Sequence, residues 1–76
     1  MVKIKDNVDL KELEKFGFKK SGDFYNLFFD EFNEVIIDEQ DRIIELDGDV
    51  NYLNVDKYNN IIFDLIQAGL VEKVGE

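Results

Sequence analysis

The carboxylates are the residues with which this 76-residue chain could do chemistry, because Asp and Glu number 18 against 9 Lys and Arg. Paired carboxylates can act as a general acid and base, and clusters of them can bind calcium or attract a basic partner. Ten of them lie between residues 23 and 49, where Arg42 is the only cation. We therefore expect any working surface to lie in this part of the chain.

The residue types that are missing exclude most enzyme mechanisms. The chain has no His, Cys or Thr, and Ser21 is its only serine. Serine triads, thiolate nucleophiles and metal sites built from Cys or His therefore cannot form. A carboxylate pair would need an apolar cleft to raise the pKa of one member, and nothing in the sequence indicates such a cleft. We predict a protein that is not an enzyme and that uses no cofactor.

The segment of residues 47–51 is a weak calcium candidate. Asp47, Asp49 and Asn51 match the first three alternating oxygen ligands of a calcium-binding loop. The motif then fails, because Tyr52 stands where the loop needs glycine and Tyr58 where it needs a bidentate glutamate. A solvated acidic turn is the simpler interpretation.

Acidic residues also follow one predicted hairpin and its exit. A solvated face that resists aggregation explains them most simply, and a binding surface for a basic protein is the functional alternative. The aromatic run within residues 24–32 is interpreted as core rather than as a stacking surface for bases, because acidic residues flank it. The candidate interaction residues are Asp38, Glu39, Asp41, Glu45, Asp47, Tyr25 and Phe29.

The net charge of −9 narrows the class of partner. It opposes binding to nucleic acid or to an anionic membrane, and it favours a protein with a basic surface. The sharper version of this hypothesis is an inhibitor that mimics nucleic acid, with carboxylates in the place of phosphates. We expect a monomer or a weak homodimer. The absence of cysteine, of a signal peptide and of a long apolar run predicts a cytoplasmic location.

Two helices are expected to position these surfaces. Residues 55–68 form an amphipathic helix with Asn54 as its cap and Gly69 as its stop. Its predicted apolar face consists of Val55, Tyr58, Ile62, Leu65 and Ile66. Residues 9–16 form a short first helix that ends at Gly17. The expected start of this helix is a capping box of Asp9 and Glu12, with Val8 packing against Leu13 and, after the glycine, Phe18 on Leu13.

Strands fill the middle of the chain. The predicted segments are residues 18–20, 24–29, 34–38 and 42–47, and residues 70–74 add a short terminal strand at a sheet edge. Residues 21–23 form one turn and residues 38–41 another. The second turn lacks glycine, so Asp41 is the candidate for a left-handed backbone.

Alternation along the strands predicts which face is buried. Val35, Ile37, Ile44 and Leu46 share the face that meets the long helix. Ile36 and Ile43 lie on the opposite face. They are joined there either by Phe24 and Phe28 or by Tyr25, Leu27 and Phe29, and this surplus must be covered by the first helix, by a partner or by a second copy.

The fold class predicted for residues 1–76, as one domain, is α+β. A short N-terminal helix precedes an antiparallel sheet of three to four strands, a long C-terminal helix packed on that sheet, and a short terminal strand. The opening KIKDNVDLKELEKFGFKK and the closing FDLIQAGLVEKV resemble a group of small, uncharacterised proteins from low-GC Gram-positive bacteria and their prophages. The resemblance implies a bacterial or phage protein and carries no assigned activity.

Overall fold

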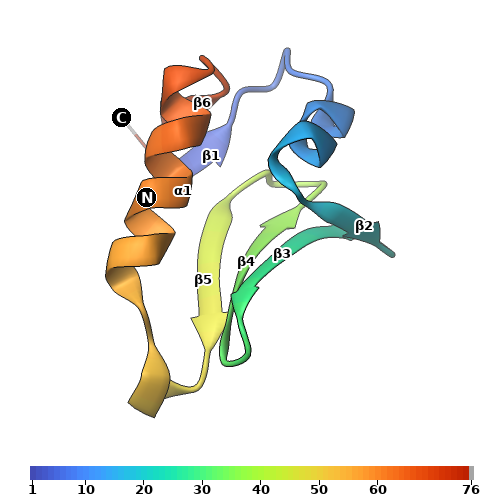
Figure 1. Ribbon diagram of the computed structural model, residues 1–76. Helices are drawn as coiled ribbons and strands as arrows, with labels where there is room; N and C mark the ends of the chain where they lie inside the picture. The colour runs from blue at the N-terminus through green and yellow to red at the C-terminus, as the bar shows by residue number, and fades with distance from the viewer. Residues whose placement is uncertain (76) are drawn as a thin grey trace.

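The α+β architecture is confirmed by the computed structural model, which describes residues 1–75 (Figure 1). Four strands in the middle of the chain form the main sheet, and the chain ends form a second, two-stranded sheet. The strands are β1 (Val2–Ile4), β2 (Lys19–Ser21), β3 (Phe24–Asp30), β4 (Asn33–Asp38), β5 (Ile44–Gly48) and β6 (Val71–Lys73). The helical segments are η1 (Leu10–Phe16), η2 (Val50–Tyr52) and α1 (Val55–Gln67).

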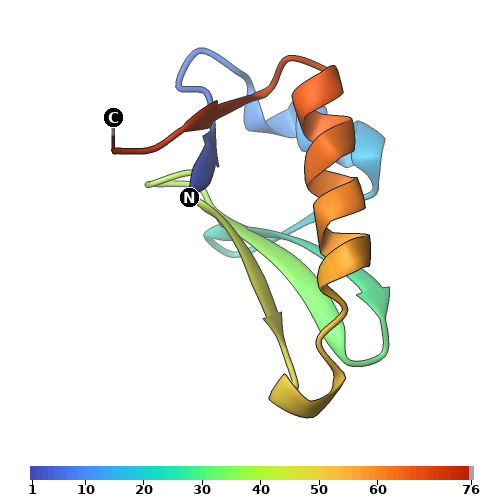
Figure 2. The ribbon, with the colours of Figure 1, turned by 90° about the vertical axis from the view of Figure 1, so that its left-hand side faces the viewer.

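The main sheet is an antiparallel meander in the order β2-β3-β4-β5. The terminal strand β6 does not extend this sheet, as the sequence had suggested, but pairs antiparallel with β1, a strand that was not predicted. A single bridge between Lys3 and Ile43 joins the two sheets. Figure 2 shows the paired chain ends lying beyond the end of the main sheet, near the C-terminal end of α1.

The first helical segment, η1, is a 3₁₀ helix, and its N-terminal box is only half formed. Asp9 caps it by accepting from the Lys11 amide. The Glu12 carboxylate contacts the Lys15 ammonium at 2.7 Å instead of returning to the cap. The segment ends as predicted at Gly17, which has a φ of 95°, with the Phe18 amide donating to the Leu13 carbonyl.

The long helix α1 also begins and ends as predicted. Asn54 accepts from the Lys57 amide, and after Gly69 (φ 78°) the Leu70 amide donates to the Leu65 carbonyl at 3.1 Å. The predicted apolar face was too wide. Ile62 and Leu65 are buried and Tyr58 is half-buried, whereas Val55 and Ile66 are 52% and 49% exposed.

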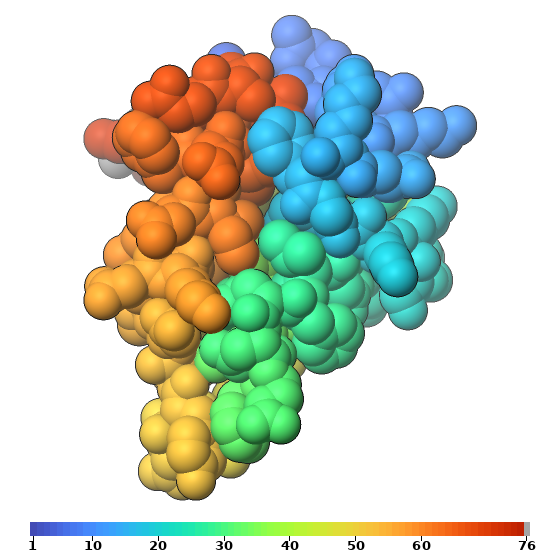
Figure 3. Space-filling model, viewed as in Figure 1, coloured from blue at the N-terminus to red at the C-terminus, as the bar shows by residue number. Residues whose placement is uncertain are grey.

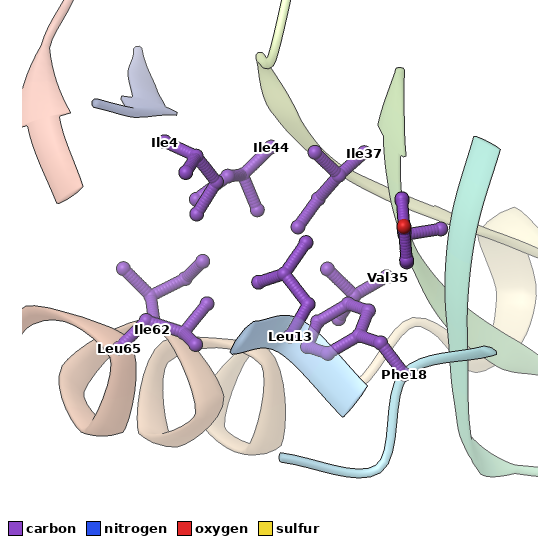
Figure 4. Close-up of a cluster of buried hydrophobic side chains, with 9 residues drawn as sticks. Ile4, Leu13, Phe18, Val35, Ile37, Ile44, Ile62 and Leu65 are labelled. Atoms are coloured by element: carbon purple, nitrogen blue, oxygen red, sulfur yellow. The ribbon is translucent and has the colours of Figure 1, made fainter. Parts of the chain in front are cut away.

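One core lies between the main sheet and the two helical segments η1 and α1 (Figure 4). Figure 2 shows η1 and α1 on the same side of the sheet, so neither covers the other face. The predicted inner face of the hairpin is confirmed, because Val35 pairs with Leu46 and Ile37 with Ile44. The buried hydrophobic residues are Ile4, Leu13, Phe18, Tyr25, Val35, Ile37, Ile44, Ile62 and Leu65.

The prediction of a left-handed Asp41 is wrong, because the left-handed residue is Arg42, with a φ of 62°. Asp41 instead accepts from the Ile43 amide in a local turn. Arg42 is held in place by contacts with the N-terminal segment. Its backbone carbonyl accepts from Ile4, and its guanidinium donates to the carbonyl oxygen of Val8.

Candidate functional site

The face of the main sheet that points away from the core is called the outer sheet face. The register of β3 on β4 decides which aromatic residues occupy it. Tyr25 pairs with Ile37, and Leu27 pairs with Val35, so these residues point inward. Phe24 and Phe28 therefore point outward, and they are 42% and 70% exposed. Of the two alternatives that the sequence left open, the Phe24 and Phe28 set is the observed one.

Two of the predicted interaction residues pack into or against the core. Tyr25 is only 4% exposed and is part of the core, so its assignment to an interaction surface is wrong. Phe29 lies at an irregularity in the β3–β4 register and packs, half-buried, against the core. The exposed aromatic residues that replace them are Phe24 and Phe28.

The carboxylates of the acidic hairpin gather around one end of the outer sheet face. Asp38 and Asp41 each accept a backbone amide in the β4–β5 loop, from Gln40 and Ile43 respectively. Glu39 is not part of this group, and its carboxylate pairs with the Lys20 ammonium at 3.4 Å. A hollow of about 80 Å³ opens on this end of the face and is lined by Phe24, Ile36, Asp38, Asp41, Ile43 and Glu45.

Like charges stand directly opposite each other further along the same face. Glu34 on β4 is the cross-strand neighbour of Asp47 on β5, and Glu45 is opposite Ile36 on the same face. Asn26 donates to the Glu34 carboxylate at 3.1 Å, and its side-chain oxygen is buried without a hydrogen-bond partner in the described part of the chain. Neither Glu34 nor Asp47 forms an ion pair within residues 1–75.

The calcium candidate is divided between two elements. Asp47 lies in β5, and Asp49 accepts from the Asn51 amide as the cap of η2. Within the described residues, no three Asp or Glu side chains come together in a group that could hold a metal ion. Calcium binding by Asp47, Asp49 and Asn51 therefore stays a prediction that no carboxylate cluster supports.

A second surface, which the sequence did not predict, lies at the end of the molecule opposite the paired chain ends. We call it the tip. The β3–β4 turn and η2 lie side by side there, as Figures 1 and 3 show in green and yellow. The rings of Phe32 and Tyr52 stack, with centroids 4.3 Å apart and planes at 16°. The exposed apolar residues of the tip are Phe32, Val50, Tyr52, Leu53 and Val55.

A buried amide holds the tip together. Asn33, only 1% exposed, donates to the Asp30 carboxylate and to the Tyr52 carbonyl, and it accepts from the Asn54 amide. Every polar atom of this side chain therefore has a partner, which is what a buried amide requires. Gly48 completes the arrangement, because a Cβ there would lie 2.4 Å from the Phe32 carbonyl oxygen.

The Asp30 carboxylate is kept ionised by the same network. The hydrogen bond from the Asn33 side chain, followed by the one from the Phe32 amide, holds the pKa of Asp30 below its usual value. Beside Asp30 lies an open hollow of about 430 Å³, which is lined by Asp30, Tyr52, Leu53, Asn54, Val55 and Asp56. Carboxylates and apolar side chains thus share one recess.

Sequence reasoning missed the tip because its parts come from two unpatterned segments. Phe32 was assigned to an aromatic run interpreted as core, and residues 47–51 were interpreted as a solvated acidic turn. The available signal was that Val50, Tyr52 and Leu53 are apolar residues gathered in a loop with no alternation that would bury them.

A further hollow, of about 300 Å³, lies along β2 and the adjoining part of β3. Gly17, Lys19, Ser21, Asn26, Leu27 and Phe28 line it. No helix in residues 1–75 is long and apolar enough to cross a membrane. Comparison of the chain with protein-family models, curated proteins and solved structures found no match.

Proposed function

We propose that this chain is a small non-enzymatic interaction domain that binds a basic protein through its outer sheet face. The observation that carries the proposal is the cross-strand pair of Glu34 and Asp47, neither of which forms an ion pair within residues 1–75. Like charges placed directly opposite each other destabilise a sheet. A basic partner would relieve that repulsion, so the stability lost in the free protein becomes affinity in the complex.

The apolar residues of the same face support a protein rather than a small cation as the ligand. Phe28 is 70% exposed, and Phe24 lies beside the acids at the β4–β5 end of the face. Exposed aromatic residues next to charges match the composition of protein interfaces, where a desolvated apolar centre is surrounded by polar groups. Neither η1 nor α1 covers these residues, because both pack on the opposite face of the sheet.

The test compares two variants with the same net charge. Glu45→Lys combined with Asp47→Lys reverses charge on the outer sheet face, and Glu14→Lys combined with Asp64→Lys reverses it on η1 and α1. The immobilised wild-type protein is expected to retain a basic protein from a lysate of the source organism at low salt. The first variant should lose this protein and the second should keep it. Equal retention by both variants, or no retained protein at all, would contradict the proposal.

The alternative is an inhibitor that mimics nucleic acid and occupies a basic groove. Glu45 and Asp47 favour it, because residues two apart on one strand lie on the same face about 7 Å apart. Ile36 opposite Glu45, and the acids on η1 and α1, fit a mimic less well. The two candidates differ in one measurement. DNA should displace the chain from its partner if the chain is a mimic, and it should leave the complex intact if it is not.

A further inference from the structure

The hollow along β2 and β3, which we call the β2–β3 hollow, is mostly apolar and less open than the hollow at the tip. Two features of the fold leave it unfilled. Gly17 contributes no side chain, and β2 pairs with β3 only as far as Asn26 (Figure 1). Within residues 1–75, no strand therefore lies beside Leu27 and Phe28 on the β2 side. A volume of about 300 Å³ is at the lower end for ligand pockets and suits one large side chain.

The side chain of Asn26, which lines this hollow, has one polar atom without a partner. Its nitrogen donates to the Glu34 carboxylate at 3.1 Å, whereas its oxygen is buried and accepts no hydrogen bond from the described residues. The orientation of the amide is determined by this bond, because a carboxylate accepts hydrogen bonds and an amide oxygen cannot donate one. An unpaired buried acceptor costs free energy, so the free protein lacks a donor at this place.

The ligand that fits is apolar over most of its surface and carries one N–H or O–H group. An aliphatic side chain has no donor for the Asn26 oxygen. A cationic side chain would lie beside the Lys19 ammonium and lose water against apolar walls. Tyrosine and tryptophan combine a large apolar ring with a single donor at its end. We propose that the β2–β3 hollow receives a tyrosine or tryptophan side chain of the partner, which donates to the Asn26 oxygen.

Two exposed side chains complete the site. Phe28 is 70% exposed and borders the hollow, so its ring can pack against that of the ligand. Lys19 is the cross-strand neighbour of Asn26 and forms no ion pair within residues 1–75. Its long side chain can move aside as the ring enters and then lie over the ring, whose face attracts cations.

Asn26 and Phe28 lie on the outer sheet face, so the use of this hollow rests on the function proposed for that face. The next strand, β4, carries Glu34 opposite Asp47. An aromatic residue with basic neighbours would therefore contact the hollow and the carboxylates at once. Tyrosine and tryptophan, with arginine, are the residues that most often dominate the binding energy of protein interfaces.

The experiment is a titration of the full chain with capped tripeptides, followed by amide chemical shifts. Gly-Trp-Gly and Gly-Tyr-Gly should each give saturable shifts at residues 17, 19 and 26–28, and the tighter of the two identifies the preferred side chain. Methylation of the indole nitrogen or of the phenol oxygen removes the donor and should weaken binding by about fivefold. Equal affinity of methylated and unmethylated peptides, or no shifts at these residues, would overturn the proposal.

The variant Asn26→Leu tests the acceptor. Methylated and unmethylated peptides should bind this variant equally, because the advantage of the donor requires the Asn26 oxygen. Glu34→Gln is the control, since it keeps Asn26 and still offers an oxygen to the Asn26 nitrogen, so the advantage should persist. An undiminished advantage of the unmethylated peptide in Asn26→Leu would place its donor elsewhere and refute the proposal.

Two exposed phenylalanines give a second, matched comparison that leaves Asn26 in place. Phe28→Ala removes one wall of the hollow and should weaken the binding of Gly-Trp-Gly by about threefold. Phe63→Ala changes a residue of α1 that is 57% exposed and does not line the hollow, so the affinity should not change. Identical affinities of the two variants would contradict the proposal.

Capped Lys-Gly-Lys separates this site from the function proposed for the whole face. It has basic groups without a ring and should shift residues 45 and 47 but not residues 26–28. If it does so while Gly-Trp-Gly causes no shifts, the hollow is refuted and the proposed function stands. The reverse result would support the hollow and count against the proposed function. Shifts at residues 26–28 that depend on protein concentration without peptide would show that a second copy occupies the hollow, and they would also refute the proposal.

Discussion

Arg42 donates a hydrogen bond of 2.7 Å to the carbonyl oxygen of Val8, 34 residues earlier in the chain. The same guanidinium nitrogen donates to the Lys5 carbonyl at 2.7 Å. These contacts fasten the β4–β5 loop to the segment between β1 and η1. They also explain why Arg42, the only arginine of the chain, has a left-handed backbone that glycine would normally adopt.

Substitutions of Arg42 should separate the contribution of its side-chain hydrogen bonds to stability from the cost of its left-handed backbone. Arg42→Ala removes the charged hydrogen bonds and should lower the free energy of unfolding by about 2 kcal/mol. Arg42→Gly removes the same bonds but relieves the left-handed strain, so it should be about 1 kcal/mol more stable than the alanine variant. Urea unfolding at pH 7 measures both. Equal stability of the two variants would mean that the backbone at Arg42 is not strained.

Gly48 should be intolerant of any side chain. A Cβ at Gly48 would lie 2.4 Å from the Phe32 carbonyl oxygen and 2.8 Å from the Asn33 side-chain oxygen. Gly48→Ala should therefore cost about 2 kcal/mol and shift the ring resonances of Tyr52, because the β3–β4 turn has to move. Gly22→Ala is the control. It meets open space, and its cost should be limited to the strain of a φ of 59°, about 1 kcal/mol.

At acidic pH, the dependence of the free energy of unfolding on pH should include a contribution from Asp30. Its folded-state pKa lies below the ordinary value of 3.8, with the Asn33 side chain as the main cause. The ionised carboxylate is therefore favoured by folding. This stabilisation is present above pH 3.8 and is lost as the pH falls through the folded-state pKa. A carboxyl-carbon NMR titration should show the pKa of Asp30 rising towards its ordinary value in Asn33→Ala.

Asp6 provides the control for that titration. The hydrogen bond and charge of Lys3 lower the pKa of Asp6, and the two side chains are 2.8 Å apart. Lys3→Gln should therefore raise the pKa of Asp6 and leave that of Asp30 unchanged. If the pKa of Asp30 is unchanged in Asn33→Ala, the Asn33 hydrogen bond is not the cause of the lowered pKa.

Charge repulsion on the outer sheet face should be measurable in the free protein. Asp47→Asn removes one member of the pair with Glu34 and should raise the free energy of unfolding by about 0.5 kcal/mol. The Tm of the wild type near pH 7 should rise as NaCl increases over a few hundred millimolar, and the rise should be smaller in this variant. Glu39→Gln removes the ion pair with Lys20 and should not raise the free energy of unfolding. A flat salt dependence in the wild type would contradict the repulsion.

The parts of the fold that follow from neighbouring residues were predictable from the sequence. The glycine stops at Gly17 and Gly69 and the caps at Asp9 and Asn54 depend on residues within one or two turns. The inner face of β4 and β5 follows from strict alternation. The same alternation left β3 undecided, because Phe24 to Phe29 has apolar residues at nearly every position and only the pairing of Tyr25 with Ile37 chooses between faces.

Distant contacts account for what was not predicted. The backbone of Arg42 is determined by hydrogen bonds to the carbonyl groups of residues 5 and 8. Turn preferences that consider only neighbouring residues therefore predicted the left-handed backbone at Asp41 instead. The tip depends on Asn33 reaching Tyr52 and Asn54 across about 20 residues. In the sequence Asn33 is one more polar residue near a turn, and only its burial shows that it organises the candidate recess.

The pairing of β1 with β6 determines when β1 can dock during folding. Ile4 is fully buried, yet within residues 1–75 its strand pairs only with β6 and, through one bridge, with Ile43. The meander from β2 to β5 consists of contacts between sequence neighbours, whereas β1 must wait for residues that leave the ribosome nearly 70 positions later. Although β1 precedes the other strands of residues 1–75, it is therefore expected to be among the last to dock. Until then the apolar side chains that Ile4 covers stay open to water.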